Sequence, residues 1–252
     1  MKRVVVPELL DSDSGTPQEV AGSLADLRML NRYFGGVRTM SALISEVAAQ
    51  RKLSDVTWLD VGGGAGDLAT LTAESLRRSS ITLHAVVLDR APSHLNGHDN
   101  GGPSTSLRIS AADSGSASAS LTPAGHLKVC GDALALPFRD GSFDIVGSSL
   151  FAHHLEPDEL ARFAREGLRV ARHALVINDL IRHPLHWALA SAGRVIYRSR
   201  ITRHDAVASV RRAYTVEEMQ AILGAAGATK TSITTFYLYR MGVIAWKAPS
   251  TT

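Results

Sequence analysis

The glycine-rich turn at 60–66 constrains the fold of this 252-residue chain more than any other feature. It follows a short run of β-branched and aromatic residues at 56–61, and it precedes a segment, 68–76, whose apolar residues have helical spacing. A second apolar run, 83–88, comes next and ends at Asp89. Strand, glycine turn, helix and strand in this order predict a βαβ unit with two parallel strands. We therefore expect an open α/β sheet that binds its ligand beside this turn.

The turn itself reads Asp-Val-Gly-Gly-Gly-Ala-Gly. Glycines let a backbone turn sharply and approach a ligand at distances that a Cβ would prevent. The dinucleotide fingerprint G-x-G-x-x-G would need a glycine where Asp67 stands. A carboxylate there repels a diphosphate but not a sulfonium or ammonium group, so the spacing disfavours NAD. We predict that a ligand is contacted by Asp60, Gly62, Gly63, Gly64 and Gly66.

Two acids follow the next strands of the predicted sheet. Asp89 ends the second strand, next to Arg90, and its carboxylate can accept hydrogen bonds from both hydroxyls of a ribose. Asp132 follows the third strand and can accept from the amino group of an adenine, with the N–H of Ala133 against the ring. These residues, in register with the glycine turn, predict contacts to an adenine and its ribose.

The glycine turn, Asp89, GDALALPF at 131–138, SFDIV at 142–146 and SLFAHHL at 149–155 together resemble class I S-adenosylmethionine-dependent methyltransferases. The resemblance is strongest to the small-molecule branch that includes the methyltransferases of ubiquinone and menaquinone biosynthesis. The chain also resembles, more loosely, methyltransferases encoded beside type III polyketide synthases, and this resemblance implies a role in secondary metabolism.

This resemblance implies S-adenosylmethionine as the cofactor, with Ser149 and Leu150 beside its methionine part. It also implies a strand order of 3-2-1-4-5-7-6 with an antiparallel seventh strand. The methyl acceptor would be a small hydrophobic compound of phenolic, pyrone or quinone type, methylated on oxygen or, as an alternative, on carbon.

Two histidines, His153 and His154, follow the fourth strand, at the end where open α/β sheets bind ligands. A phenol, with a pKa of about 10, would gain from a base that takes its proton. Asp158 stands four residues after His154, which resembles the spacing in plant-type O-methyltransferases. We predict His154, in preference to His153, as the general base; the alternative is a packing role. No spacing of Cys, His and acids predicts a metal site.

The expected fold class is α/β, a doubly wound, mostly parallel sheet of seven strands. A helical extension is expected over 1–50 and the methyltransferase domain over 51–252. Inside that domain, 91–126 is rich in Ser and Gly and predicts a flexible insertion. The segment 181–213 predicts a lid over the substrate.

Composition bears mainly on partners and compartment. The formal net charge is +3, and no nucleic-acid motif accompanies the late arginines, so nucleic acid is not expected. Those arginines could instead face an anionic membrane surface. One cysteine, Cys130, and no apolar stretch long enough for a signal peptide favour the cytoplasm. A non-catalytic cofactor-binding partner and an NAD-dependent oxidoreductase are the alternative functions; the oligomeric state is not predicted.

Overall fold

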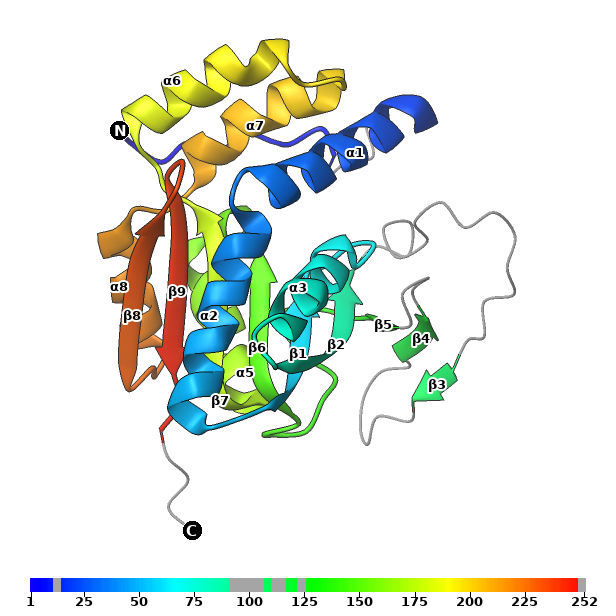
Figure 1. Cartoon of the computed structure of the whole chain (residues 1–252). Coiled ribbons are helices and arrows are strands. Elements are labelled where there is room, and N and C mark those ends of the chain that lie inside the picture. Colours follow the sequence, from blue (N-terminus) through cyan, green and yellow to red (C-terminus); the bar gives the residue numbers. More distant parts are fainter. Residues whose placement is uncertain (11–14, 91–106, 110–116, 122–125, 249–252) are drawn as a thin grey trace.

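The computed structural model describes residues 1–10, 15–90, 107–109, 117–121 and 126–248. Its centre is one sheet (Figure 1). The strands are β1 (Asp55–Val61), β2 (Thr82–Asp89), β3 (Leu107–Ile109), β4 (Ala117–Leu121), β5 (Leu127–Cys130), β6 (Phe143–Ser149), β7 (Ala171–Leu180), β8 (Lys230–Phe236) and β9 (Arg240–Trp246).

The sheet order is β3-β4-β5-β2-β1-β6-β7-β9-β8. Strands β5, β2, β1, β6 and β7 run parallel, and β9 runs antiparallel to both β7 and β8. Without β3 and β4, this is the order 3-2-1-4-5-7-6 with an antiparallel seventh strand, so the expected fold is confirmed. The chain leaves β1 for β2 on one side and returns as β6 on the other, and such a switch point leaves a crevice at the carboxyl ends of the strands.

Strands β3 and β4 extend the sheet beyond β5 as an antiparallel pair. They lie within 91–126, where the sequence predicts a flexible insertion, so this segment contains regular backbone pairing that its composition does not reveal. The rest of the insertion, 91–106, 110–116 and 122–125, lies outside the described residues.

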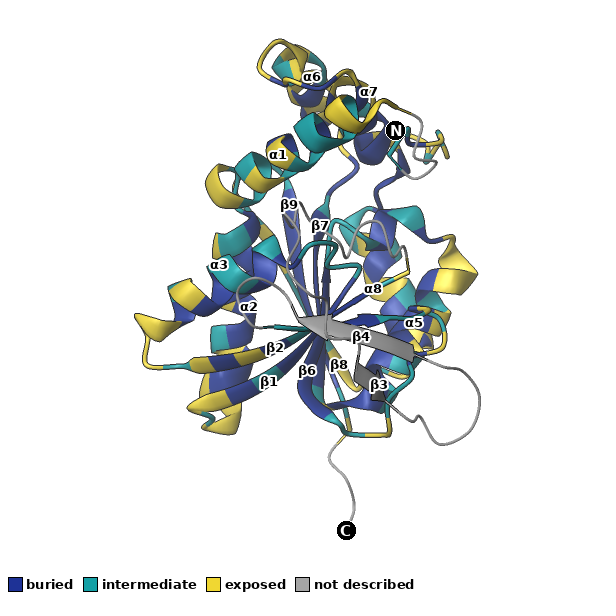
Figure 2. Ribbon diagram, turned by 90° about the vertical axis from the view of Figure 1, so that its right-hand side faces the viewer, coloured by how far each residue is buried: buried dark blue, intermediate teal, exposed yellow. Residues whose placement is uncertain are grey.

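Helices cover both faces of the sheet, as the edge-on view in Figure 2 shows. On one face α2 and α3 pack around the buried Trp58, and on the other α5 and α8 pack around the buried Phe163. The helices are α1 (Pro17–Tyr33), α2 (Gly36–Arg51), α3 (Asp67–Arg77), α5 (Pro157–Val170), α6 (Pro184–Ala192), α7 (Arg200–Arg212) and α8 (Val216–Ala225), with 3-10 turns η1 (Ala152–His154) and η2 (Gly193–Val195). No helix among the described residues is long and apolar enough to cross a membrane.

Two helices, α1 and α2, lie in the stretch where the sequence predicts a helical extension. They part at Gly35, whose φ of +89° lies in the left-handed region that glycine adopts without strain. The two helices have different surroundings. Helix α2 packs on β7, β9 and α3, with Met40 and Ile44 fully buried, whereas α1 contacts α7. Of this extension, only α2 belongs to the core.

Helices α1, α6 and α7 form a layer over the carboxyl ends of the strands (Figure 1). The sequence analysis placed 181–213 in a lid but did not predict the helix α7. Asp26 of α1 accepts hydrogen bonds from the backbone N–H groups of Arg198 and Ser199, at 3.0 Å each. Asp205 of α7 accepts from Leu9 N at 2.8 Å and also from the next backbone N–H. Hydrogen bonds from backbone N–H groups to the carboxylates of Asp26 and Asp205 therefore hold the layer together. The amino-terminal segment is part of this layer.

Candidate active site

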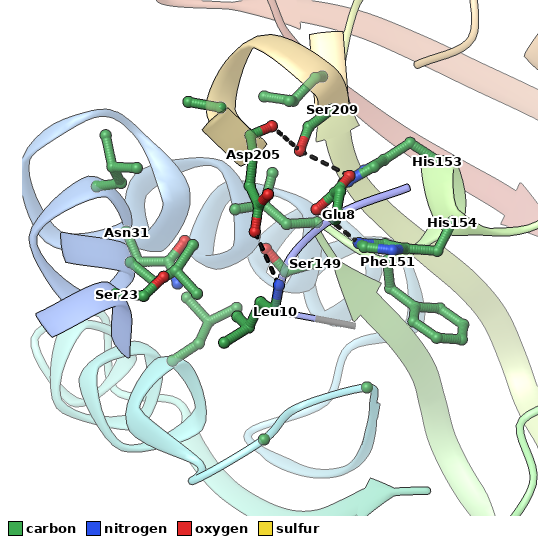
Figure 3. Close-up of a pocket in the computed structure, with 18 of the residues that line it drawn as sticks. Glu8, Leu10, Ser23, Asn31, Ser149, Phe151, His153, His154, Asp205 and Ser209 are labelled. Carbon is green, nitrogen blue, oxygen red and sulfur yellow. Dashed lines mark hydrogen bonds and ion pairs between the residues drawn. The ribbon is translucent and has the colours of Figure 1, made fainter. Parts of the chain in front are cut away.

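A cavity of about 970 Å³ lies between this helical layer and the carboxyl ends of the strands. Its size lies at the upper end of the range for ligand sites. The loops after β1, β2, β5 and β6 form one wall, and α1, α6 and α7 form the other. Figure 3 shows side chains from both walls pointing into this space.

The glycine turn forms one end of the cavity through Gly62, Gly63 and Gly64, whereas Gly66 lies outside the lining. Gly62 and Gly64 have φ values of +71° and +52°. A Cβ on Gly62 would come within 2.7 Å of the Phe151 ring, whereas a Cβ on Gly64 would meet no atom within 4 Å. The backbone at Gly64 therefore faces open space, and a ligand can lie against it.

Asp60 is fully buried beneath this turn and lines the cavity. Neither of its carboxylate oxygens has a hydrogen-bond partner among the described residues. Burial and, second, the negative charge of Asp89 raise the pKa of Asp60 to about 8. A buried carboxylate without partners is costly unless a cation approaches it. This wall of the cavity therefore suits a ligand that carries an ammonium or sulfonium group.

Asp89 and Arg90, at the end of β2, both line the cavity as predicted. An Asp89 carboxylate oxygen (Oδ2) accepts a hydrogen bond from the backbone N–H of Gly64 at 3.0 Å. Asp89 thereby holds the glycine turn against β2.

After β5, the structure brings Ala133 to the cavity but not Asp132. The Asp132 side chain is exposed, and its Oδ1 accepts from the N–H of Leu134 at 2.9 Å. Such a bond to the backbone two residues on is the usual conformation of a turn aspartate. Gly131, Ala133 and Leu134 form this part of the wall instead.

Ser149 and Leu150, after β6, both line the cavity. Leu150 has a φ of +52°, an unfavourable conformation for a residue with a Cβ. Asn178 of β7 holds it there, because its carbonyl accepts from Leu150 N at 2.9 Å and its side-chain amide donates to Ser149 Oγ at 3.0 Å. The backbone strain is therefore supported by the neighbouring strand.

His153 is buried, and Asp179 of β7 determines its orientation. Its Nδ1 lies 2.7 Å from Asp179 Oδ1, and its backbone N–H donates to Asp179 Oδ2 at 3.0 Å. Burial alone would lower the pKa of His153, but the charge and hydrogen bond of Asp179, with the nearby charge of Glu8, raise it to about 10. His153 is therefore protonated at neutral pH and unsuited to be the base, and the general-base role of His154 stays a prediction.

Glu8, in the amino-terminal segment, faces both histidines. Its Oε1 lies 3.5 Å from His153 Nε2, and its Oε2 lies 3.8 Å from His154 Nε2. Burial would raise the pKa of Glu8, but the two histidines and a 2.9 Å hydrogen bond from Ser209 lower it. We call Glu8, His153 and His154 the Glu8 cluster; all three line the cavity (Figure 3).

Sequence reasoning missed Glu8 and paired His154 with Asp158 instead. Asp158 is exposed in the first turn of α5. Glu8 reaches the histidines only because the layer of α7 carries its segment over the sheet. A lone acid in an irregular stretch gave no signal of this.

Comparison with known proteins supports this interpretation of the fold. Residues 59–174 match the sequence family described as "Methyltransferase domain". None of the curated proteins matches the chain. The structure of human N-acetylserotonin methyltransferase with S-adenosylmethionine is similar, with a TM-score of 0.59 and 14% identity over 96% of this chain and 60% of that one.

Two bacterial structures are similar to the same degree. An O-methyltransferase family 2 protein from Planctomyces limnophilus, in complex with apigenin, has a TM-score of 0.55 and 14% identity over 93% of this chain and 63% of that one. A protein from Nostoc punctiforme, provisionally assigned as an O-methyltransferase, has a TM-score of 0.56 and 12% identity over 98% of this chain and 64% of that one.

The chain thus spans less than two thirds of the length of these three proteins, and identities this low establish the fold alone. With the domain match over 59–174, they agree with the methyltransferase fold that the sequence predicts.

Proposed function

Because residues 59–174 form a methyltransferase domain on a class I fold, we propose that the protein transfers a methyl group from S-adenosylmethionine to an oxygen of a small hydrophobic acceptor. The observation that carries this proposal is the single cavity that joins two unlike ends. At one end, a glycine turn lies over an unpartnered carboxylate. At the other lies the Glu8 cluster.

The residues at the first end fit the cofactor. The backbone at Gly64 leaves room for close approach, Asp89 offers a carboxylate to the ribose, and Ala133 lies at the wall assigned to adenine. A cationic ligand beside Asp60 would favour the ionised form of this carboxyl, which has no hydrogen-bond partner among the described residues. S-adenosylmethionine supplies a methyl group already activated by its sulfonium, so the protein has mainly to position the acceptor.

The second end fits an apolar acceptor with one hydroxyl. Leu27, Phe34, Leu189 and Ile196 line the cavity between the glycine turn and the helical layer. Such a wall binds a ring or chain by burial, and the Glu8 cluster then fixes the hydroxyl. We propose a phenolic, pyrone or quinol acceptor whose proton is lost at this cluster. His154 is its more accessible histidine, with 23% of its side chain exposed against 2% for His153.

We further propose that this acceptor reaches the cavity from an anionic membrane surface. Helix α6 and the η2 turn expose a patch of large apolar side chains. The exposed arginines of 181–213 are Arg194, Arg198, Arg200, Arg203 and Arg211. Apolar side chains beside basic ones are typical of segments that lie in a membrane interface. Ile196 belongs to both the patch and the cavity lining. The exposed patch comprises Leu185, Trp187, Leu189, Val195 and Ile196.

The test measures cofactor binding and transfer separately. Calorimetry should show that S-adenosylmethionine and its demethylated product bind, and that NAD does not. Labelled S-adenosylmethionine should then transfer label to phenolic, pyrone or quinol acceptors. No binding at millimolar cofactor would refute the proposal. Binding without transfer to any acceptor would favour the alternative, a non-catalytic partner protein.

A further inference from the structure

We propose that the Glu8 cluster binds one divalent transition-metal ion, of the zinc type, at the acceptor end of the cavity. The positions of the three side chains are the basis for the binding of the ion. The use of the ion to activate an acceptor hydroxyl rests on the proposed function.

The three side chains offer a donor set and spacing that suit such an ion. Glu8, His153 and His154 place one ligand atom each within 4.8 Å of one another. Two histidine nitrogens with one carboxylate are a common zinc set that leaves a position open. Ligands at about 2.0–2.2 Å in tetrahedral geometry lie about 3.4 Å apart. Glu8 Oε1 lies 3.5 Å from His153 Nε2 and Glu8 Oε2 lies 3.8 Å from His154 Nε2, both close to this separation, and side-chain rotation would bring the three ligands onto one ion.

The same separations are long for direct ion pairs. A charge-assisted N–H···O bond spans about 2.7–2.9 Å, and the Asp179–His153 contact has that length, at 2.7 Å. The distances from the Glu8 oxygens to the two imidazoles are longer than the Asp179–His153 distance by about an ångström. The gap lies between the three ligand atoms, where an ion would be bound.

Asp179 supplies the outer support that metal-binding histidines have. A ligating histidine usually donates its other ring N–H to a carboxylate, which fixes the ring and increases its basicity. Asp179 does this at Nδ1 of His153 and is itself held by the backbone N–H groups of His153 and Leu180. The opposite nitrogen, His153 Nε2, is buried and has no hydrogen-bond partner among the described residues. An ion would replace the proton on that nitrogen.

Glu8 is held in place from the other side. Ser209 donates to its Oε1 at 2.9 Å, and Asp205 accepts from the N–H groups of Leu9 and Leu10 directly after it. Arg212 NH1, at 3.8 Å from Oε1, opposes a second cation. Glu8 and Asp179 place two carboxylates beside the histidines, and an ion that replaces the proton of His153 would be bound between these charges.

Three protein ligands leave an open position on the cavity side. An ion there would attract the hydroxyl oxygen of an acceptor and lower its pKa, so that the proton leaves to water. His154 Nε2 would then be a ligand and could not accept a proton. A metal-bound His154 could not be the general base predicted from the sequence, so the experiment must distinguish these two roles.

Protein treated with EDTA and then dialysed should be titrated with Zn²⁺ by calorimetry and with Co²⁺ by visible absorption. We expect one ion per chain and the absorption of a four- or five-coordinate Co²⁺ site. Glu8→Gln and His154→Ala should each weaken Zn²⁺ binding at least roughly tenfold, and Asp179→Asn by roughly ten- to a hundredfold. The matched controls, Glu46→Gln and His84→Ala, change exposed side chains outside the cluster and should bind like the parent.

Binding of S-adenosylmethionine by every variant would show that each is folded. No saturable Zn²⁺ binding to the parent, or equal binding by Glu8→Gln and His154→Ala, would overturn the metal site while leaving the proposed function intact. Equal transfer rates in chelated and Zn²⁺-loaded enzyme would overturn the role in activation and return the proton to His154. Zn²⁺ binding without cofactor binding would refute the proposed function and leave the metal site standing.

Discussion

Replacing Asp60 by asparagine should stabilise the unliganded protein and weaken its binding of S-adenosylmethionine. Asp60 is buried without a hydrogen-bond partner among the described residues, and burial with the charge of Asp89 raises its pKa from 3.8 to about 8. The folded state therefore binds the proton more tightly than the unfolded state does. The stability that this proton provides is complete below pH 3.8 and declines as the pH rises toward 8.

The magnitude follows from the same shift. At pH 7 this carboxyl is ionised in the unfolded state and protonated in the folded state. Because pH 7 lies about 3.2 units above the unfolded pKa of 3.8, taking up the proton on folding costs about 4 kcal/mol, at about 1.36 kcal/mol per unit. Asparagine removes the charge but keeps polar atoms that stay unpaired at a cost of about 1–3 kcal/mol. We expect Asp60→Asn to raise the free energy of unfolding by about 1–3 kcal/mol at pH 7.

Urea denaturation at pH 5, 6, 7 and 8, with and without cofactor, measures both effects. The gain in Asp60→Asn should grow with pH, and saturating cofactor should stabilise the parent more than the variant. Asp55→Asn, at the exposed start of the same strand, is the matched control and should change neither quantity. A gain that is absent at pH 8, or equal at all four values, would contradict the raised pKa of the buried Asp60 carboxyl.

Three further outcomes follow from the site. Asp89→Ala should weaken cofactor binding by about 1–3 kcal/mol in calorimetry, because ribose contacts and the bond to the glycine turn are lost; unchanged affinity would reject its role. His154→Ala should lower turnover by at least about tenfold with little effect on cofactor affinity, and an unaffected kcat would leave it a packing residue. The double change Trp187→Ala with Val195→Ala should reduce co-sedimentation with phosphatidylglycerol vesicles, while the exposed Tyr237→Ala should not; equal reductions would argue against the membrane surface.

Predictions that depend on neighbouring residues in the chain agree with the structure. The glycine turn between β1 and α3 and the helix α3 itself both lie where local pattern places them. Both depend on residues close together in the chain, such as glycines that adopt a positive φ without strain. The strand order was implied by family resemblance, not by these local patterns.

Local pattern was insufficient where competing contacts decide the outcome. Asp132 has the position expected of an adenine contact, yet its carboxylate bonds to Leu134 N two residues on and lies outside the cavity lining. Helix α7 lies in an arginine-rich segment without a clear apolar period, and it is held by Asp26 of α1 through the backbone just before it. Neither contact is visible in the spacing of residues.

The sequence alone determined the glycine-turn end of the cavity, because a strand, its glycine turn and the acid of the next strand are consecutive in the chain. Tertiary structure alone decided the end that holds the Glu8 cluster. Glu8 meets Ser209 across 201 positions of sequence, and His153 takes its orientation from Asp179 on the adjacent strand. Side chains so far apart in the chain become neighbours only when the helical layer is tied over the sheet, and no periodicity in the sequence encodes that packing.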